Sequence, residues 1–168
     1  WSKKDARAVM TRLAKYIDIC IANEEDAKDV FDIEAPGTNI ENGTLSKDGY
    51  RFVAKELSAQ FGFKNVAITL RTSLSASRNK WSALLFDGKD FFFGPEYDIH
   101  IVDRIGAGDS FTAGLIYALL FGKNQQEAIQ FAVAASCLKH SIEGDFNMVT
   151  AAEVELLAAG NASGRIQR

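Results

Sequence analysis

The residues best suited to chemistry lie between positions 103 and 114, in the sequence Asp-Arg-Ile-Gly-Ala-Gly-Asp-Ser-Phe-Thr-Ala-Gly. Gly106, Ala107 and Gly108 form a predicted tight turn before an apolar helix, which we expect from about residue 109 to 121. Glycine lets the backbone approach an anion closely and point its N–H groups toward it. The start of a helix adds roughly half a positive charge. Such a segment suits the binding of phosphate.

Asp109 needs a separate explanation, because a carboxylate beside a bound phosphate is repelled by it. A substrate hydroxyl lying between the two resolves the conflict. The carboxylate then accepts the hydroxyl proton, while backbone N–H groups hold the charge of the transferring phosphoryl group. Such general-base help is typically worth about 10²–10⁴ in rate. The alternative is that Asp109 only favours the helix dipole, and the four residues 106–109 by themselves leave both interpretations open.

Two other nucleotide-binding loops fit this segment poorly. A dinucleotide-binding loop needs a third glycine where Phe111 stands, and it follows the first strand of its domain rather than a late one. A P-loop needs Gly-Lys-Ser or Gly-Lys-Thr, which the sequence lacks. A nicotinamide-dependent oxidoreductase is therefore the weakest of the functions that we consider.

A second polar cluster, Asn23-Glu24-Glu25-Asp26, follows a strand-like run at residues 17–21 and opens a predicted helix that reaches about residue 31. Taken alone, it is a charge cluster at a helix start. Further along, Thr69, Leu70 and Arg71 lie at the predicted end of a short apolar strand.

Alternating helices and strands must position these residues. We expect helices near residues 2–16, 24–31, 47–61, 109–121, 124–139 and 149–159, and strands at 17–21, 66–70, 81–86, 90–93 and 97–102. Residues 32–46 and 71–80 are predicted polar loops, and the strands at 81–86 and 90–93 are predicted to form a hairpin. The pattern predicts an α/β fold, in which the strand at 66–70 is central to a mainly parallel sheet.

The segment from Asp103 to Gly114 closely resembles the C-terminal signature of the ribokinase-like sugar kinases of the phosphofructokinase-B type. Asn23 to Asp26 then resembles that family's motif for magnesium and phosphate, and Thr69 to Arg71 its nucleotide contact. Within the family, the nearest likeness is to the 2-keto-3-deoxygluconate kinases. It rests on residues 68–71 with the Ser-rich loop that ends in Asn79, on Val102-Asp103-Arg104, and on the late Gly144-Asp145-Phe146-Asn147. The resemblance implies a Rossmann-like ribokinase fold, of which this chain is the C-terminal part.

The resemblance also implies roles for single residues. Asp109 corresponds to the catalytic base, and Gly106, Ala107 and Gly108 to the anion hole. The positions that correspond to nucleotide contacts are Asn23, Thr69, Arg71, Ser73, Ser136, His140 and Asn147. Asp26 and Glu25 correspond to the Mg²⁺ motif, with Asp26 in place of the usual glutamate, and Asp103 falls where many members hold a monovalent cation such as K⁺.

Two of these positions keep a plainer alternative. Arg104 replaces a common threonine, and its charge suits the carboxylate of an acidic substrate, but an outward-facing loop arginine fits equally well. His140 ends a predicted helix, where a histidine favours the C-terminal dipole.

Composition narrows the function classes further. The net charge of −3 disfavours nucleic acid as the main partner. The sequence contains neither a signal peptide nor an apolar run of about 20 residues, so we expect a cytoplasmic protein without a membrane partner. Because the chain opens on a helix, we expect all 168 residues to form the nucleotide-binding and catalytic portion of a sugar kinase domain, without its N-terminal substrate and lid half. An uncovered sheet edge would favour homo-oligomers.

Two hypotheses remain. The first is an ATP-dependent kinase that phosphorylates a hydroxyl of a sugar or sugar acid, most closely 2-keto-3-deoxygluconate. The second is a non-catalytic nucleotide-binding or oligomerising fragment that keeps the fold but lacks the sugar site.

Overall fold

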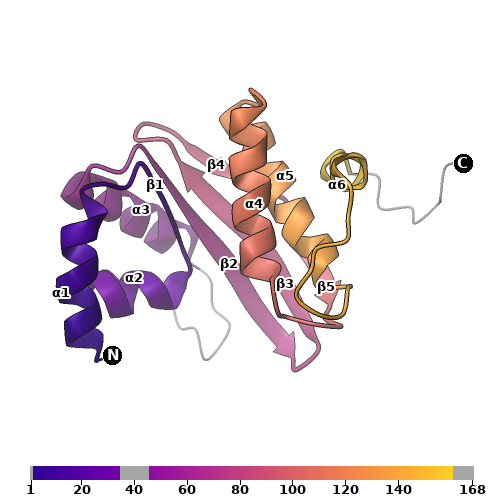
Figure 1. The fold of residues 1–168 in the computed structure, drawn as a ribbon, viewed down its shortest axis with the longest axis horizontal. Coiled ribbons are helices and arrows are strands. Elements are labelled where there is room, and N and C mark those ends of the chain that lie inside the picture. Colours follow the sequence, from indigo (N-terminus) through magenta and orange to yellow (C-terminus); the bar gives the residue numbers. More distant parts are fainter. Residues whose placement is uncertain (1, 35–45, 161–168) are drawn as a thin grey trace, which may run out of the picture.

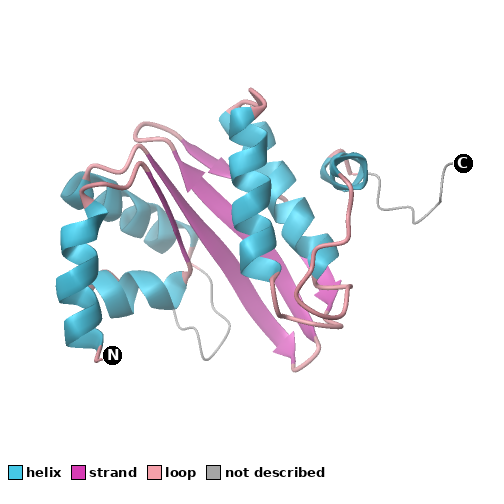
Figure 2. Cartoon of the chain, viewed as in Figure 1, coloured by secondary structure: helices cyan, strands magenta, loops and turns pink. Residues whose placement is uncertain are grey.

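In the computed structural model, which describes residues 2–34 and 46–160, eleven helices and strands form one α/β unit. The helices are α1 (Lys3–Ala14), α2 (Glu24–Phe31), α3 (Lys47–Phe61), α4 (Ala107–Leu120), α5 (Gln125–Lys139) and α6 (Ala151–Ala158). The strands are β1 (Ile19–Ala22), β2 (Asn65–Ser75), β3 (Arg78–Phe86), β4 (Phe91–Phe93) and β5 (Tyr97–His100). Figure 2 shows how the long β2 and β3 form the spine of the molecule.

The five strands form one mixed sheet. Its order is β1-β2-β3-β4, and β5 pairs with the first part of β3. Only β1 and β2 are parallel, while β3 runs antiparallel to β2, β4 and β5. The α/β class is therefore confirmed, but the prediction of a mainly parallel sheet is wrong for this part of the chain, because two hairpins supply three of its five strands.

Helices cover the sheet on both sides. Figure 1 shows α1, α2 and α3 gathered beyond one face and α4 and α5 lying across the other. Ala67, Leu85 and Phe111 belong to the core under α4 and α5, whereas Val66, Ile68 and Leu84 belong to the core under α3. Successive side chains of a strand point to opposite faces, so β2 and β3 contribute to both cores. No helix in the described residues is long and apolar enough to cross a membrane.

The β2–β3 hairpin corrects a second prediction. Residues 71–80 were expected to form a polar loop, but β2 continues to Ser75 and β3 begins at Arg78. The Ser and Thr side chains there are largely exposed, so no apolar alternation indicates a strand. The predicted hairpin at residues 81–93 is confirmed by the pairing of β3 with β4. Most of the predicted loop at 32–46 lies outside the described residues.

Side-chain caps fix where several helices begin. Asn23 caps α2 and Asn124 caps α5, each in a capping box with the carboxylate three residues on. Thr150 caps α6 in the same way. Because these caps are local, the predicted helix starts agree with the structure to within about two residues.

Candidate active site at the start of helix α4

Gly106 makes the sharp turn from which α4 begins. Its φ is 74°, in the left-handed region, and it precedes Ala107 as the N-cap residue. A Cβ atom at Gly106 would overlap the carbonyl oxygen of Asp145 and lie 2.9 Å from that residue's Oδ1. The position therefore needs glycine for two reasons, the backbone conformation and the close approach of another loop.

Gly108 and Asp109 face outward from the first turn of α4. Both are exposed, and a Cβ atom at Gly108 would meet no atom within 4 Å. N–H groups in the first turn of a helix have no acceptor within the helix, so they can bind an outside anion. Of the predicted anion hole, the structure thus leaves open space at Gly108 and places the Asp109 carboxylate beside it, whereas Ala107 is buried and its N–H donates to the Arg104 carbonyl.

The Asp103 carboxylate anchors the turn through two hydrogen bonds. Its Oδ1 accepts the N–H of Ile105 at 3.0 Å, and its Oδ2 accepts the N–H of Gly144 at 2.8 Å. These two bonds, first that of Ile105 and then that of Gly144, hold the pKa of the Asp103 carboxyl below its ordinary value, and the charge of Lys139 adds to the effect. Asp103 therefore ties the loop before α4 to the loop after α5.

Ser136 and His140 belong to the same framework. The Ser136 hydroxyl donates to the carbonyl oxygen of Ala107 at 2.8 Å, and both residues are buried. The carbonyl oxygen of His140 accepts the N–H groups of Val102 and Asp103 at 2.8 and 3.2 Å.

The His140 ring is 4% exposed and lies 5.0 Å from the Trp81 ring, centroid to centroid. Burial lowers its pKa, although the hydrogen bond to the Ser136 carbonyl raises it. In this structure Ser136 and His140 therefore hold the turn from behind, and neither presents an open face to a ligand.

Basic side chains surround this framework. Charge repulsion from Arg104, Lys139 and Arg71 also lowers the pKa of His140, so these cations lie near it. The exposed Arg104 donates from Nη2 to the carbonyl oxygen of Ala76 at 2.8 Å, at the tip of the β2–β3 hairpin. The site thus has positive charge on the side of the sheet that faces α4 and α5, as an anionic nucleotide would require.

Asn147 reaches α4 from the loop before α6. Its Nδ2 lies 2.5 Å from the Ser110 hydroxyl, and Phe146 and Met148 on either side of it are 82% and 77% exposed. Asn147 is itself exposed, so this loop offers both apolar and polar groups beside the first turn of α4.

Asn23 and Asp26 form the capping box of α2. The Asn23 Oδ1 accepts the N–H groups of Glu25 and Asp26 at 2.8 Å, and the Asp26 Oδ2 accepts the N–H of Asn23 at 3.0 Å. The cap occupies one carboxylate oxygen of Asp26, while Glu25 is exposed. No three His, Cys, Asp or Glu side chains of the described residues converge as a metal cluster. Oxygen donors of this kind suit Mg²⁺ that keeps several waters and also binds phosphate.

An apolar cavity of about 560 Å³ brings the two predicted motifs together. Asp26 from α2 and Thr112 from α4 both line it, and the Thr112 hydroxyl donates to the Gly108 carbonyl at 3.0 Å. The parallel pairing of Ala22 with Ile68 also brings Asn23, just after β1, beside Thr69. Thr69 lies within β2, which continues to Ser75, so the predicted strand end at residues 69–71 is wrong. Ser73, in contrast, is exposed further out on the hairpin.

The burial of Lys139 and Asn79 was not predicted from the sequence. Both are 0% exposed. The Asn79 amide suits its surroundings when its oxygen faces the Arg104 Nη1 at 3.2 Å and its nitrogen faces the Arg78 carbonyl at 2.9 Å. The sequence does contain a signal for an unusual role of Lys139. It is a lysine in the otherwise apolar end of α5, and lysine is almost never buried without a partner.

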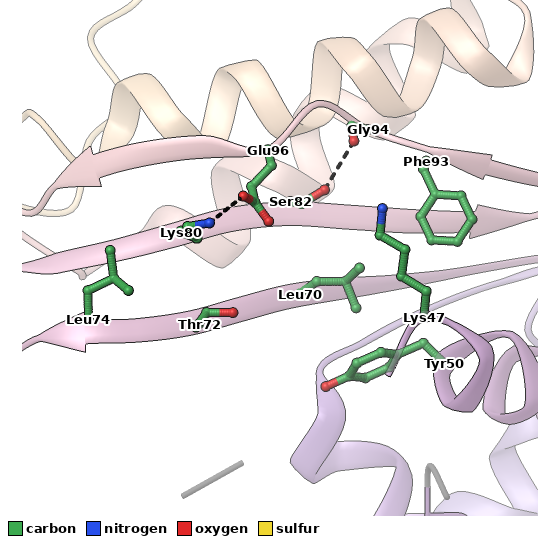
Figure 3. A pocket seen from close by; sticks show the side chains of 10 residues that line it. All are labelled: Lys47, Tyr50, Leu70, Thr72, Leu74, Lys80, Ser82, Phe93, Gly94 and Glu96. Carbon is green, nitrogen blue, oxygen red and sulfur yellow. Dashed lines mark hydrogen bonds and ion pairs between the residues drawn. The ribbon is translucent and has the colours of Figure 1, made fainter. Parts of the chain in front are cut away.

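A second cavity, of about 430 Å³, lies on the opposite face of the sheet (Figure 3). Leu70 and Thr72 of β2 line it, whereas the predicted ligands Thr69, Arg71 and Ser73 alternate with them and point away. Thr69, Arg71 and Ser73 therefore point to the face that carries α4 and α5.

The chain is similar in sequence to known proteins. The sequence profile of the pfkB family carbohydrate kinases matches residues 1–151. A curated relative, 2-dehydro-3-deoxygalactonokinase of Haloferax volcanii, is 27% identical over 164 residues, which make up 98% of this chain and 45% of that protein.

Solved structures extend the comparison to the fold. The crystal structure of 2-dehydro-3-deoxygluconokinase from Thermotoga maritima matches with a TM-score of 0.88 and 44% identity, over 95% of this chain and 47% of that one. Phosphofructokinase-2 from Escherichia coli, solved in complex with potassium, matches with a TM-score of 0.69 and 16% identity, over 91% and 44% of the two chains. The predicted ribokinase-like fold is confirmed, and the chain spans about half the length of the relatives that it matches.

Proposed function

Because this chain belongs to the pfkB family of carbohydrate kinases, we propose that its protein transfers a phosphoryl group from ATP to a hydroxyl of a sugar acid, with 2-keto-3-deoxygluconate as the substrate. The observation that carries this proposal is the first turn of α4. There the exposed Asp109 carboxylate stands beside the open Gly108, behind a glycine turn that is tied down on both sides.

The substrate class rests on two arguments. The relatives described above, from Haloferax volcanii and Thermotoga maritima, are named as kinases of 2-dehydro-3-deoxy sugar acids. In addition, Arg104 and Arg71 give the site a positive charge that would attract a substrate carboxylate as well as phosphates. We assign the contact with the substrate carboxylate to Arg104, since its guanidinium is exposed beside the turn.

In the proposed mechanism Asp109 accepts the proton of the attacking hydroxyl. The N–H groups of Gly108 and Asp109, at the positive end of α4, stabilise the charge on the transferring phosphoryl group. Asn23 and Asp26, with Glu25 beside them, would hold Mg²⁺ directly or through water. When bound, Mg²⁺ neutralises charge on the phosphate oxygens of the nucleotide. Contacts with the nucleotide are assigned to Thr69, Arg71, Ser73 and Asn147.

The chain covers only 45% and 47% of the two sugar-acid kinases, so activity of the whole protein is part of the proposal. The alternative, a nucleotide-binding or oligomerising fragment without turnover, keeps the same turn but needs no base. The two therefore differ in whether a sugar is phosphorylated and whether Asp109 acts as a base.

Asp109→Asn tests the proposal directly. The protein is assayed with ATP, Mg²⁺ and a panel of keto-deoxy sugar acids and neutral sugars. We expect the variant to lose about 10²–10⁴ in kcat, because an amide cannot accept the proton, while ATP still binds.

Asp48→Asn is the matched control. Asp48 is an exposed carboxylate in the first turn of α3, so it shares the dipole interaction of Asp109 but lies outside the site. If Asp109 only favours the helix dipole, both variants lose a few tenths of a kcal/mol of stability and keep full activity. ATP binding without phosphorylation of any sugar by the unaltered protein would favour the fragment.

A further inference from the structure

Lys139 occupies an unusual place at the end of α5. Its side chain is 0% exposed, and its ammonium donates to the carbonyl oxygen of Ile142 at 3.0 Å. Lysine is rarely buried in full, because removing an ammonium from water costs several kcal/mol unless opposite charge or carbonyl oxygens replace the water. A buried lysine at this position therefore calls for an explanation beyond packing.

The chain that follows Lys139 wraps back onto the turn of the candidate active site. The carbonyl oxygen of His140 accepts the N–H groups of Val102 and Asp103, and the N–H of Gly144 donates to the Asp103 carboxylate. The ammonium is thus enclosed by the same loop, residues 139–144, that grips Asp103. The carbonyl groups at the end of α5 add partial negative charge.

The charges around this loop fit one cation. Lys139 is near enough for its charge to act on the Asp103 carboxylate, and the hydrogen bonds to the Ile142 carbonyl and from the Gly144 N–H join both groups to the same loop. Arg71 and Arg104 are near enough to act on His140 and add positive charge, while Glu143 and Asp145 of the same stretch of chain are exposed carboxylates. Each oxygen of Asp103 already accepts a backbone N–H. A monovalent metal ion, which the sequence led us to expect at Asp103, would add a second positive charge next to the ammonium and be repelled by it.

We propose that the Lys139 ammonium is the permanent cation of this loop, and that it holds Asp103 and the turn at Gly106 to Gly108 in place without a monovalent metal ion. Lys139 is a positioning residue, because it acts on the site through Asp103 and the loop. The consequence for turnover rests on the proposed kinase function, whereas the consequence for the fold does not.

The first test uses the unaltered protein in chloride salts of K⁺, NH₄⁺ or tetramethylammonium at equal ionic strength. We expect the midpoint of thermal unfolding and the phosphorylation rate to be the same in all three, within about twofold for the rate. A K⁺-specific rise in either quantity would overturn the proposal, because it would show that the loop still binds a metal ion.

The second test removes the charge with Lys139→Met, which keeps an apolar stem of similar length. In tetramethylammonium we expect a lower unfolding midpoint and roughly a tenfold lower rate, corresponding to about 1.4 kcal/mol. K⁺ or NH₄⁺ should restore both, since a small cation can enter the vacated position. Lys123→Met is the control, because Lys123 is also partly buried and pairs with Glu155 at 3.0 Å, far along the chain from the turn. It should show no response to the cation.

A double variant separates electrostatics from packing. If Lys139 balances Asp103, the Asp103→Asn and Lys139→Met double variant has no charge to satisfy and should lose the response to K⁺. A Lys139→Met protein that is insensitive to K⁺ would contradict the proposal. If that protein does not fold, the cation series on the unaltered protein still decides. Absence of phosphorylation in every salt would reject the kinase function, while the unfolding midpoints would still test the role of Lys139.

Discussion

At the scale of single residues, two glycines two positions apart have opposite requirements. Gly106 has a φ of 74° and lies against Asp145, so its role is to form the turn. Gly108 is helical and faces open space, so nothing in the fold requires it to be glycine. The proposed ligand supplies the missing reason, because a side chain there would occupy the place of the anion.

These two glycines give a paired prediction. Gly106→Ala should lower the free energy of unfolding by about 1–3 kcal/mol, owing to the left-handed backbone and the overlap with Asp145. Gly108→Ala should leave stability unchanged or raise it by about 0.5–1 kcal/mol, as alanine does within helices. Its ATP affinity or phosphorylation rate should nevertheless fall.

Denaturant unfolding and nucleotide titration of both variants measure these effects. A Gly108→Ala protein with unchanged binding and activity would remove the anion hole from the first turn of α4.

At the scale of elements, the capping boxes of α2 and α5 allow structure and function to be separated. Asn23 and Asn124 have the same local role, and each pairs with a carboxylate three residues on. Only Asn23 lies in a predicted ligand motif. A cap by itself therefore explains Asn23 as well as Asn124, and the difference must come from chemistry.

Asn23→Ala and Asn124→Ala should each cost about 0.5–2 kcal/mol of stability, because each frees a helix-start N–H. Of the two, Asn23→Ala should also weaken Mg²⁺-dependent ATP binding. Calorimetric titration of ATP with and without Mg²⁺ gives the comparison. Equal binding by both variants would mean that Asn23 is a cap and nothing more.

The elements also show how far the sequence could lead. The starts of α2, α5 and α6 were predictable because a cap is a short local signal. The extension of β2 and β3 over residues 71–80 was not, since most side chains there are polar and exposed and show no apolar alternation. The burial of His140 against Trp81, and that of Lys139, depends on contacts with segments distant in the sequence and could not be read from neighbouring residues.

At the scale of the whole molecule, β1 is the edge of the described sheet. It pairs with β2 on one side. Ile19 and Ile21 line the apolar cavity beside it, together with Ile116, which is 43% exposed. An uncovered edge with apolar neighbours is a template for pairing with another strand.

We therefore expect a polypeptide of residues 1–168 to associate as its concentration rises. Ile19→Lys should reduce this association, because a charge at an edge strand opposes pairing. Leu120→Lys is the control, since it removes an exposed apolar side chain from the far end of α4 instead. Sedimentation velocity over a concentration series gives the result. A monomer at every concentration, or an equal effect of both variants, would contradict the prediction.

The anchoring of the turn at Gly106 also predicts how fast the nearby amide hydrogens exchange with solvent. The N–H groups of Val102, Asp103 and Gly144 are held by buried or anchored acceptors, so their hydrogens should exchange slowly with solvent. Those of Gly108 and Asp109 have no acceptor within the helix and should exchange quickly. The two amides that exchange quickly therefore lie on a turn whose neighbouring amides exchange slowly, which means that the binding surface is already rigid before any ligand arrives. An anion that settles there has little disorder to remove, and its arrival should appear as the slowing of these two amides alone.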